Sequence, residues 1–184
     1  ARKSGEERLE ALARFRLAEA LWRADDDAGG LRAAQAATAL FEKLGDRVWH
    51  GRSLWSQACA LAGLGRKTES GQAAERALAL AGQTGDLAGQ GSAWKLYRRE
   101  DPDQALRLAG LKRSLEAFGA AGYVERQLGI RHNLALAYAS MGLYRRARRM
   151  ALAVLEAETR SNDATSRALT TGVVPWIELA LRHL

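Results

Sequence analysis

The stretch that decides the fold runs from Asn133 to Ala147 and reads Asn-Leu-Ala-Leu-Ala-Tyr-Ala-Ser-Met-Gly-Leu-Tyr-Arg-Arg-Ala. It opens with an Ala- and Leu-rich segment that favours helix, and Met141-Gly142 is typical of the turn that ends one. A second helix-forming segment follows, and Ala135 and Ala147 place a small residue in each half. Two helices joined by a short turn approach closely where small residues face each other. The stretch therefore predicts one pair of antiparallel helices.

The same pattern occurs three more times, earlier in the chain. The alanines equivalent to Ala135 are Ala18, Ala58 and Ala93, so successive copies are 40, 35 and 42 residues apart. Twelve residues after each alanine comes a small residue, and sixteen residues after it comes another alanine. The first set is Gly30, Ser70, Ala105 and Ala147, and the second is Ala34, Ala74, Ala109 and Ala151. Repetition at this period predicts a stack of helix pairs, each closed by contact between these small residues.

Eight helices follow from this frame. Their expected ranges are 5–25, 30–44, 47–64, 67–83, 87–99, 103–119, 123–141 and 143–160. Turn-forming residues lie between them, including the segment from Asp25 to Gly30. Gly45, Gly85 and Gly122 come after the second helix of a pair, where glycine can adopt the left-handed conformation that ends a helix.

The third pair and the C-terminal end have features of their own. Asp101 is expected to cap a helix that begins at Pro102. After 162 the pattern fades, because Gly172 and Pro175 interrupt the next segment and leave helical pieces near 163–171 and 175–183. We therefore expect one domain over 1–184, with repeats at about 5–45, 46–85, 86–122 and 123–162. The segment 163–184 is either a cap, since terminal repeats are often atypical, or the start of a truncated fifth repeat.

Composition places few other limits on the chain. The 184 residues are 47% apolar, which is enough for a substantial core. The single Cys59 excludes an internal disulfide framework and fits a reducing cytoplasm. No apolar run is long enough to span a membrane, and no signal peptide is recognisable. Since no initiator Met precedes Ala1, we expect a cytoplasmic domain of a longer protein, not attached to a membrane, whose flanking domains are possible partners.

In detail, the segment from Asn133 to Ala147 resembles the tetratricopeptide consensus. The matching residues are Leu134, Ala135, Tyr138, Gly142, Tyr144 and Ala147. The second and third copies are degenerate, because Gln57 replaces the Leu and Glu100 replaces the turn Gly. The resemblance covers about residues 5–160 and implies an all-α fold, a right-handed α-solenoid of antiparallel helix pairs. The long repeats look like those of bacterial regulators that carry LuxR-type or cyclase domains.

Several motifs of catalysis or cofactor binding fail on their spacing. In Gly63-Leu64-Gly65-Arg66-Lys67-Thr68, Arg66 separates the Gly from the Lys, and a helix-forming segment precedes the motif where a phosphate-binding loop needs a strand. The histidines, His50, His132 and His183, fall in different repeats, and no Cys/His cluster has metal-ligand spacing. We therefore expect neither an enzyme nor a site for a cofactor or metal.

The tetratricopeptide resemblance also implies where a partner would bind, because the first helices of the pairs line a concave groove in that family. The residues that we assign to this groove or its rim are Arg16, Glu19, Arg52, Trp55, Trp94, Tyr97, Arg98, His132 and Asn133. Aromatic rings among arginines and amides suit a bound peptide, and groove asparagines of the family commonly bond a peptide main chain. The competing interpretation is that the aromatic residues pack between neighbouring repeats.

The leading prediction is thus a protein or peptide interaction module, the sensor or scaffold region of a bacterial regulatory protein. The first alternative uses the net charge of +7 and the basic run Tyr144-Arg145-Arg146-Ala147-Arg148-Arg149. Nucleic-acid binding needs a continuous basic stripe, however, and one helix segment is more often a solvated face. The second alternative is a homodimer formed by the exposed end of the stack.

Overall fold

The structure is a computed structural model that describes residues 2–97, 99, 101–161, 174–175 and 177–181. Within these ranges it is all-α and contains no strand. The helices are α1 (Arg2–Arg23), α2 (Asp27–Lys43), α3 (Arg47–Gly63), α4 (Lys67–Thr84), α5 (Leu87–Leu96), α6 (Gln104–Ala120), α7 (Val124–Ser140) and α8 (Tyr144–Ser161). All eight predicted helices are present, and every predicted end lies within three residues of the observed one. The predicted segment 163–171 lies outside the described residues, whereas 177–181 is helical.

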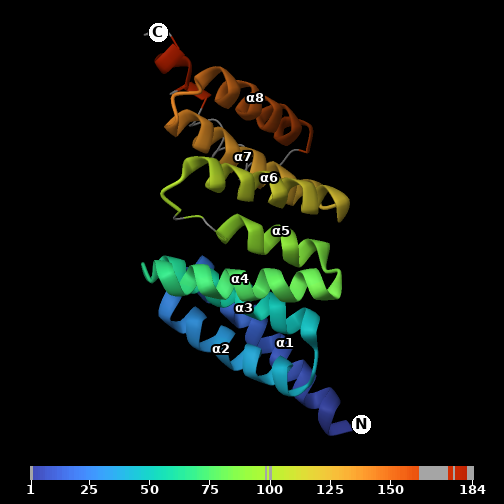
Figure 1. Cartoon of the computed structure of the whole chain (residues 1–184). Helices are drawn as coiled ribbons and strands as arrows, with labels where there is room; N and C mark the ends of the chain where they lie inside the picture. Colours follow the sequence, from blue (N-terminus) through green and yellow to red (C-terminus); the bar gives the residue numbers. More distant parts are fainter. Residues whose placement is uncertain (1, 98, 100, 162–173, 176, 182–184) are drawn as a thin grey trace. The chain divides into compact units, whose positions relative to one another are not determined.

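The chain divides into two compact units, Ala1–Ala117 and Phe118–Leu184. In the first unit, α1 pairs with α2 and α3 pairs with α4 through three-residue turns. The first helices of successive pairs are neighbours, because α3 contacts both α1 and α5. The second helices join the pairs, since α2 also packs against α3, and α4 also packs against α5 (Figure 1). The first unit therefore has the predicted helix-pair architecture, while a single domain over 1–184 stays a prediction.

The small residues of the frame close the first two pairs as predicted. Ala18 and Ala34 have no exposed surface, and neither do Ala58 and Ala74. A methyl group added to Gly30 would lie 3.1 Å from both the backbone nitrogen and the Cβ of Trp22. These contacts leave no room for larger side chains where the helices cross.

In the third pair, the predicted contact is wrong. Ala105 and Ala109 are exposed. Their places are taken, five residues later, by Gly110 and Ser114, both buried. A Cβ on Gly110 would lie 3.2 Å from the carbonyl oxygen of Trp94, and Ser114 Oγ donates a hydrogen bond to the carbonyl of Gly91 at 2.5 Å.

An early end of α5 is the reason for this shift. The helix stops at Leu96, because Tyr97 adopts an extended conformation with ψ of 126°. The connection to α6 then spans 97–103, whereas 24–26 and 64–66 suffice in the first two pairs. Asp103 rather than Asp101 caps α6, because its side chain accepts a hydrogen bond from the backbone N–H of Ala105 at 2.8 Å. The predicted start of this helix at Pro102 is therefore wrong by two residues.

Turn geometry elsewhere follows residue type. Gly45, Gly85 and Gly122 all have φ near +70°, as predicted. In the first pair, the left-handed residue is Asp25, with φ of 62°. Asp26 then accepts a hydrogen bond from the backbone N–H of Gly29 at 2.8 Å and starts α2. Because of this cap, α2 includes Gly29 and begins at Asp27, three residues before the predicted start.

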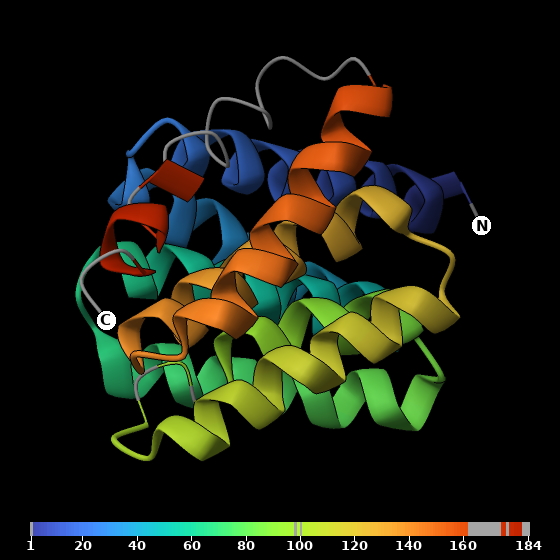
Figure 2. The ribbon, with the colours of Figure 1, turned by 90° about the horizontal axis from the view of Figure 1, so that it is seen from above.

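In the second unit, α7 pairs with α8 through a three-residue turn (Figure 2). Ala135 on α7 is fully buried, and so are Ala147 and Ala151 on α8. The segment from Asn133 to Ala147 therefore forms the close helix pair that its sequence predicts. Arg148 in the basic run of α8 donates a hydrogen bond to Glu178 at 2.5 Å, so one of its four arginines already has an intramolecular partner.

Candidate functional site

A cavity of about 280 Å³ lies where the C-terminal ends of α1, α3 and α5 meet in the first unit. We call it the tryptophan cavity. Its lining comprises Trp22, Asp25, Asp27, Trp55, Cys59, Ala62, Gly63, Lys95, Leu96 and Arg99. Three first helices thus contribute to one cavity, and among the predicted binding residues Trp55 lines it.

Two indoles form the apolar wall of this cavity. The rings of Trp22 and Trp55 meet edge to face, with centroids 6.0 Å apart. Both indole nitrogens are buried, so the rings present carbon rather than N–H to the cavity. Trp55 is only 8% exposed and belongs to the core cluster around Leu54 and Ala58. Trp55 is therefore held within the core, which limits the entropy that it loses when it contacts a guest.

Charged groups surround this wall. Lys95 and Arg99 line the cavity from α5 and from the connection that follows it. Asp25 lines it from the turn between α1 and α2, and Asp27 lines it from the start of α2. The carboxylate of Asp27 lies directly against Gly63, since a Cβ there would be 2.1 Å from its Oδ2. A guest side chain would thus find an aromatic wall with both cations and carboxylates in the lining of the cavity.

Cys59 lines the same cavity, and its thiol is expected to react slowly. Burial raises the pKa of its thiol to about 12, despite the opposing influence of Lys95, Arg99 and Arg23. Since the thiolate is the nucleophilic form, the thiol is inert at neutral pH. Cys59 packs against the core cluster around Leu54 and Trp55.

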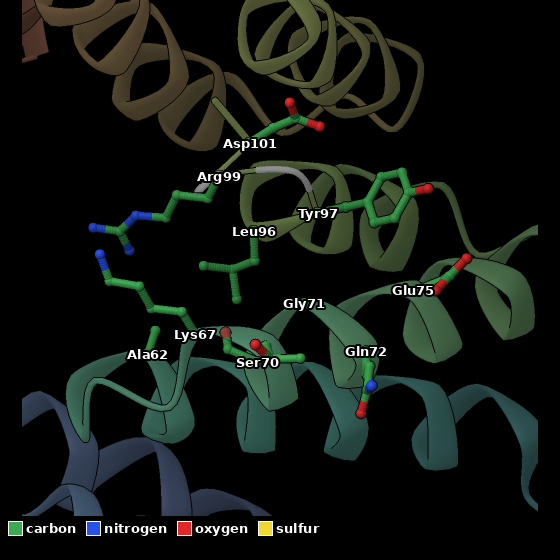
Figure 3. Close-up of a pocket in the computed structure, with 11 residues that line it drawn as sticks. Ala62, Lys67, Ser70, Gly71, Gln72, Glu75, Leu96, Tyr97, Arg99 and Asp101 are labelled. Carbon is green, nitrogen blue, oxygen red and sulfur yellow. The ribbon is translucent and has the colours of Figure 1, made fainter. Parts of the chain in front are cut away.

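A second cavity, of about 340 Å³, borders the first and shares Ala62, Leu96 and Arg99 with it. It lies between the start of α4 and the α5–α6 connection (Figure 3). Lys67 and Arg99 point toward the same side of it, and Tyr97 lies at the opposite side (Figure 3). The two cavities thus adjoin, and Tyr97, one of the predicted binding residues, lines the second one together with residues of α4.

Arg52 and Glu19, both predicted binding residues, make intramolecular ion pairs. Arg52 donates hydrogen bonds of 2.8 and 2.9 Å to the two carboxylate oxygens of Asp86. Its guanidinium also lies 5.0 Å from the ring centroid of Trp49. Glu19 is 7% exposed and accepts a hydrogen bond from Arg16 at 2.8 Å. Arg52 thus joins α3 to the start of α5, whereas the pair of Glu19 lies within α1 and Arg16 remains exposed.

Trp94 has neighbours on two sides. Its ring lies 5.4 Å from that of Tyr97 and 4.8 Å from the guanidinium of Arg113 on α6. It is half-buried and lines neither of the two cavities. Neighbouring side chains therefore cover part of this ring, as the competing interpretation of packing between helices expects.

The remaining predicted residues are not part of this site. Arg98 lies outside the described residues. His132 and Asn133 are half-buried on α7 in the second unit. Their role in partner binding stays a prediction.

Sequence reasoning missed the four charged residues of the tryptophan cavity. Lys95 and Arg99 were not singled out, because the predicted helix 87–99 gave no reason to single out residues at its end. Asp25 and Asp27 were assigned only to a turn. The signal that could have found them is the position of the turns that follow the first helices. In a stack of helix pairs, these turns lie side by side along one edge.

The described residues contain no cluster of three His, Cys, Asp or Glu that could hold a metal ion. None of their helices is both long and apolar enough to cross a bilayer. The motif that starts at Gly63 forms a helix end, a turn and a helix start, with Gly65 at φ of 72°. It therefore lacks the strand that a phosphate-binding loop requires.

Comparison with known proteins bears on the fold. No protein-family model matches the sequence, and no curated protein does. Two crystal structures from Podosopora anserina are similar, one of them of a single-substitution variant; both are described as kinesin light chain with nearly identical TPR-like repeats. Each has a TM-score of 0.68 at 15% identity, over 93% of this chain and 86% of that chain. The chain therefore has the all-α fold of the tetratricopeptide-like repeat proteins.

Proposed function

We propose that this chain is a protein interaction module, and that the tryptophan cavity and the surface beside it bind a segment of a partner polypeptide. Tetratricopeptide-like repeats generally mediate protein–protein contacts. The observation that carries the proposal is the convergence of α1, α3 and α5 on one cavity with a rigid aromatic wall and a charged rim. Such sites suit an anchoring side chain, because rigid rings supply apolar area while the rim orients polar groups.

The partner segment is extended or helical and places one apolar side chain between Trp55 and Leu96. A cavity of about 280 Å³ accommodates a side chain rather than a folded domain. Tyr97, which lines the neighbouring cavity, and Arg16, exposed on α1, offer polar contacts to the flanking main chain. In the second unit, Asn133 and His132 extend the set of partner-binding residues.

The biological setting that we propose is a bacterial cytoplasmic regulator. The long repeats favour it, because they resemble the repeat regions of such regulators. The module then acts as a sensor or scaffold, and its guest is a separate protein or a flanking domain of the same chain. No catalytic step is part of this proposal, which the inert thiol of Cys59 supports.

Site-specific photocrosslinking tests the proposed function. Arg16, exposed on α1, and Arg76, exposed on α4, are each replaced by photoreactive p-benzoylphenylalanine, and the protein is irradiated in its native host. We expect position 16 to yield a defined crosslinked protein and position 76 to yield none. Crosslinks of equal yield from both positions, or from position 76 alone, would overturn the assignment to the first-helix side.

A further inference from the structure

The start of α8 carries arginines that have no partner among the described residues. Arg145, Arg146 and Arg149 are exposed, and none of the three side chains forms an ion pair or a hydrogen bond with a described residue. At the helical rotation of about 100° per residue, they fall within an arc of about 100°. This arc lies opposite Ala147 and Ala151, the buried alanines of α8. We call these three residues the arginine cluster.

The arginine cluster is electrostatically unfavourable for the helix that carries it. The N-terminal end of a helix bears a partial positive charge, so cations there destabilise it. Arg149 also lies one turn from both Arg145 and Arg146, and like charges at this spacing repel each other. The first turn of α8 contains no acidic residue. These charges therefore oppose helix formation, and a bound anion would relieve their repulsion.

Two cavities lie beside the arginine cluster, and Arg146 lines both of them. The first, of about 420 Å³, is lined by Gly142, Leu143, Tyr144, Arg145, Arg146 and Leu181. The second, of about 290 Å³, is lined by Tyr138, Arg146, Arg149 and Met150. Each cavity combines arginine with apolar or aromatic side chains. Such linings suit a ligand that carries apolar groups next to its anionic groups.

The arginine cluster is too short to bind a long polyanion. Arg145 and Arg149 lie about 6 Å apart along the helix axis, which is enough for one or two anionic groups. About two turns further along the same face, Glu156 exposes a carboxylate, and the neighbouring Arg148 is paired with Glu178. Nucleic acid needs a continuous basic stripe that contacts many phosphates. A short polypeptide segment fits better, because arginine binds carboxylates in a bidentate geometry and the same segment supplies apolar side chains.

We propose that the arginine cluster and the two cavities beside it bind a short segment of a partner polypeptide in which acidic and apolar side chains alternate. The carboxylates of this segment bind the three guanidinium groups. Its apolar side chains enter the cavity that Leu143 and Leu181 line. This second surface shares no residue with the tryptophan cavity, so the inference does not depend on the function proposed for that cavity.

Fluorescence anisotropy of a labelled peptide, Glu-Leu-Glu-Glu-Leu-Glu, tests the proposal with the full chain. We expect saturable binding below millimolar concentration, weakened about tenfold when Gln replaces every Glu of the peptide. The double variant Arg145→Gln/Arg149→Gln should also bind about tenfold more weakly. Arg32→Gln/Arg76→Gln is the matched control, because both residues are exposed on other helices and the net charge changes equally. No saturable binding, or equal weakening by both double variants, would overturn the proposal.

Two further probes identify the kind of anion. A labelled oligothymidylate of the same net charge should bind more weakly than the peptide at physiological salt, and so should hexaglutamate, which lacks the apolar side chains. Tighter binding of the oligothymidylate through the same arginines would make this a nucleic-acid surface and overturn the proposal. Hexaglutamate that binds as tightly as the peptide would show that the cavities receive no apolar side chain.

Thermal unfolding separates loss of binding from loss of folding. Arg149→Gln should unfold at a higher temperature than the wild type at low salt, because it removes like-charge repulsion near the start of α8. The difference should shrink as salt is added. A lower or unchanged unfolding temperature would contradict the electrostatic argument, because it would mean that the fold itself uses this charge.

Discussion

Arg52 on α3 clamps Asp86, the residue that caps α5. The guanidinium donates hydrogen bonds of 2.8 and 2.9 Å to the two carboxylate oxygens of Asp86, and the carboxylate accepts the backbone N–H of Gly89 at 3.1 Å. The carboxylate of Asp86 thus caps α5 and also links this helix to α3. This link positions the α5 residues that line the tryptophan cavity.

Removing this carboxylate should destabilise the fold. Asp86→Asn keeps a good helix cap but loses the ion pair, so we expect a loss of about 1 kcal/mol in the free energy of unfolding. Asp86→Ala loses the cap as well, and we expect about 2 kcal/mol. Denaturant titration measures both. Asp86→Asn and Asp86→Ala of equal stability would show that the cap contributes nothing.

The same pair should make stability depend on pH. Burial disfavours ionisation of Asp86, but the hydrogen bonds from Arg52 and Gly89 outweigh it and hold its pKa below the usual value. A depressed carboxyl pKa contributes stability above the unfolded value of about 4, and this contribution is lost as the pH falls through the folded value. The stability difference between wild type and Asp86→Asn should therefore be largest near neutral pH and shrink in acid. A difference that is constant over this range would contradict the account.

Two glycine substitutions should have opposite effects. Gly30→Ala brings a methyl group within 3.1 Å of the Trp22 backbone nitrogen, so we expect a loss of about 1 to 2 kcal/mol. Gly82→Ala in α4 meets nothing within 4 Å, so the better helix propensity of Ala should stabilise the chain by about 0.5 to 1 kcal/mol. Thermal or denaturant unfolding distinguishes the two. Stabilisation by both substitutions would mean that α1 and α2 are not closely packed at Gly30.

The thiol of Cys59 should resist modification in the folded chain. With its pKa raised to about 12 by burial, its thiolate fraction at pH 8 is about a thousandfold below that of an ordinary cysteine. We expect reaction with a disulfide reagent to be slow in buffer and fast in denaturant. Rapid reaction of the native protein would show that the Cys59 thiol is not buried.

The sequence predicted contacts that depend on residue size and missed those that depend on helix length. Ala18 and Ala34 could be paired because small residues at a fixed spacing are visible in the sequence. The pairing of Ala93 with Ala109 was wrong, because α5 ends at Leu96 and no residue there signals the end in advance. Gly110 and Ser114, which make the contact, belong to the same class of small residues.

For the site, the sequence did not show which intramolecular contacts each predicted residue makes. Trp55 lines the tryptophan cavity, and its role in partner binding stays a prediction. Arg52 was assigned to the partner, yet its two hydrogen bonds go to Asp86, 34 residues away. Such pairs depend on the relative rotation of neighbouring helices, which the repeat period alone does not determine. For the same reason, Lys95 was overlooked.

The central claim is that the tryptophan cavity receives a side chain of the partner, and filling the cavity tests it most directly. Ala62 lines both cavities, whereas Ala39 is exposed on α2. The partner segment that crosslinking identifies is used as the free ligand. Its dissociation constants from the Ala62→Trp and Ala39→Trp variants should be measured by calorimetry. We expect Ala62→Trp to weaken binding about tenfold or more, equal to about 1.4 kcal/mol, and Ala39→Trp to leave it unchanged. Unchanged binding by Ala62→Trp would contradict the account.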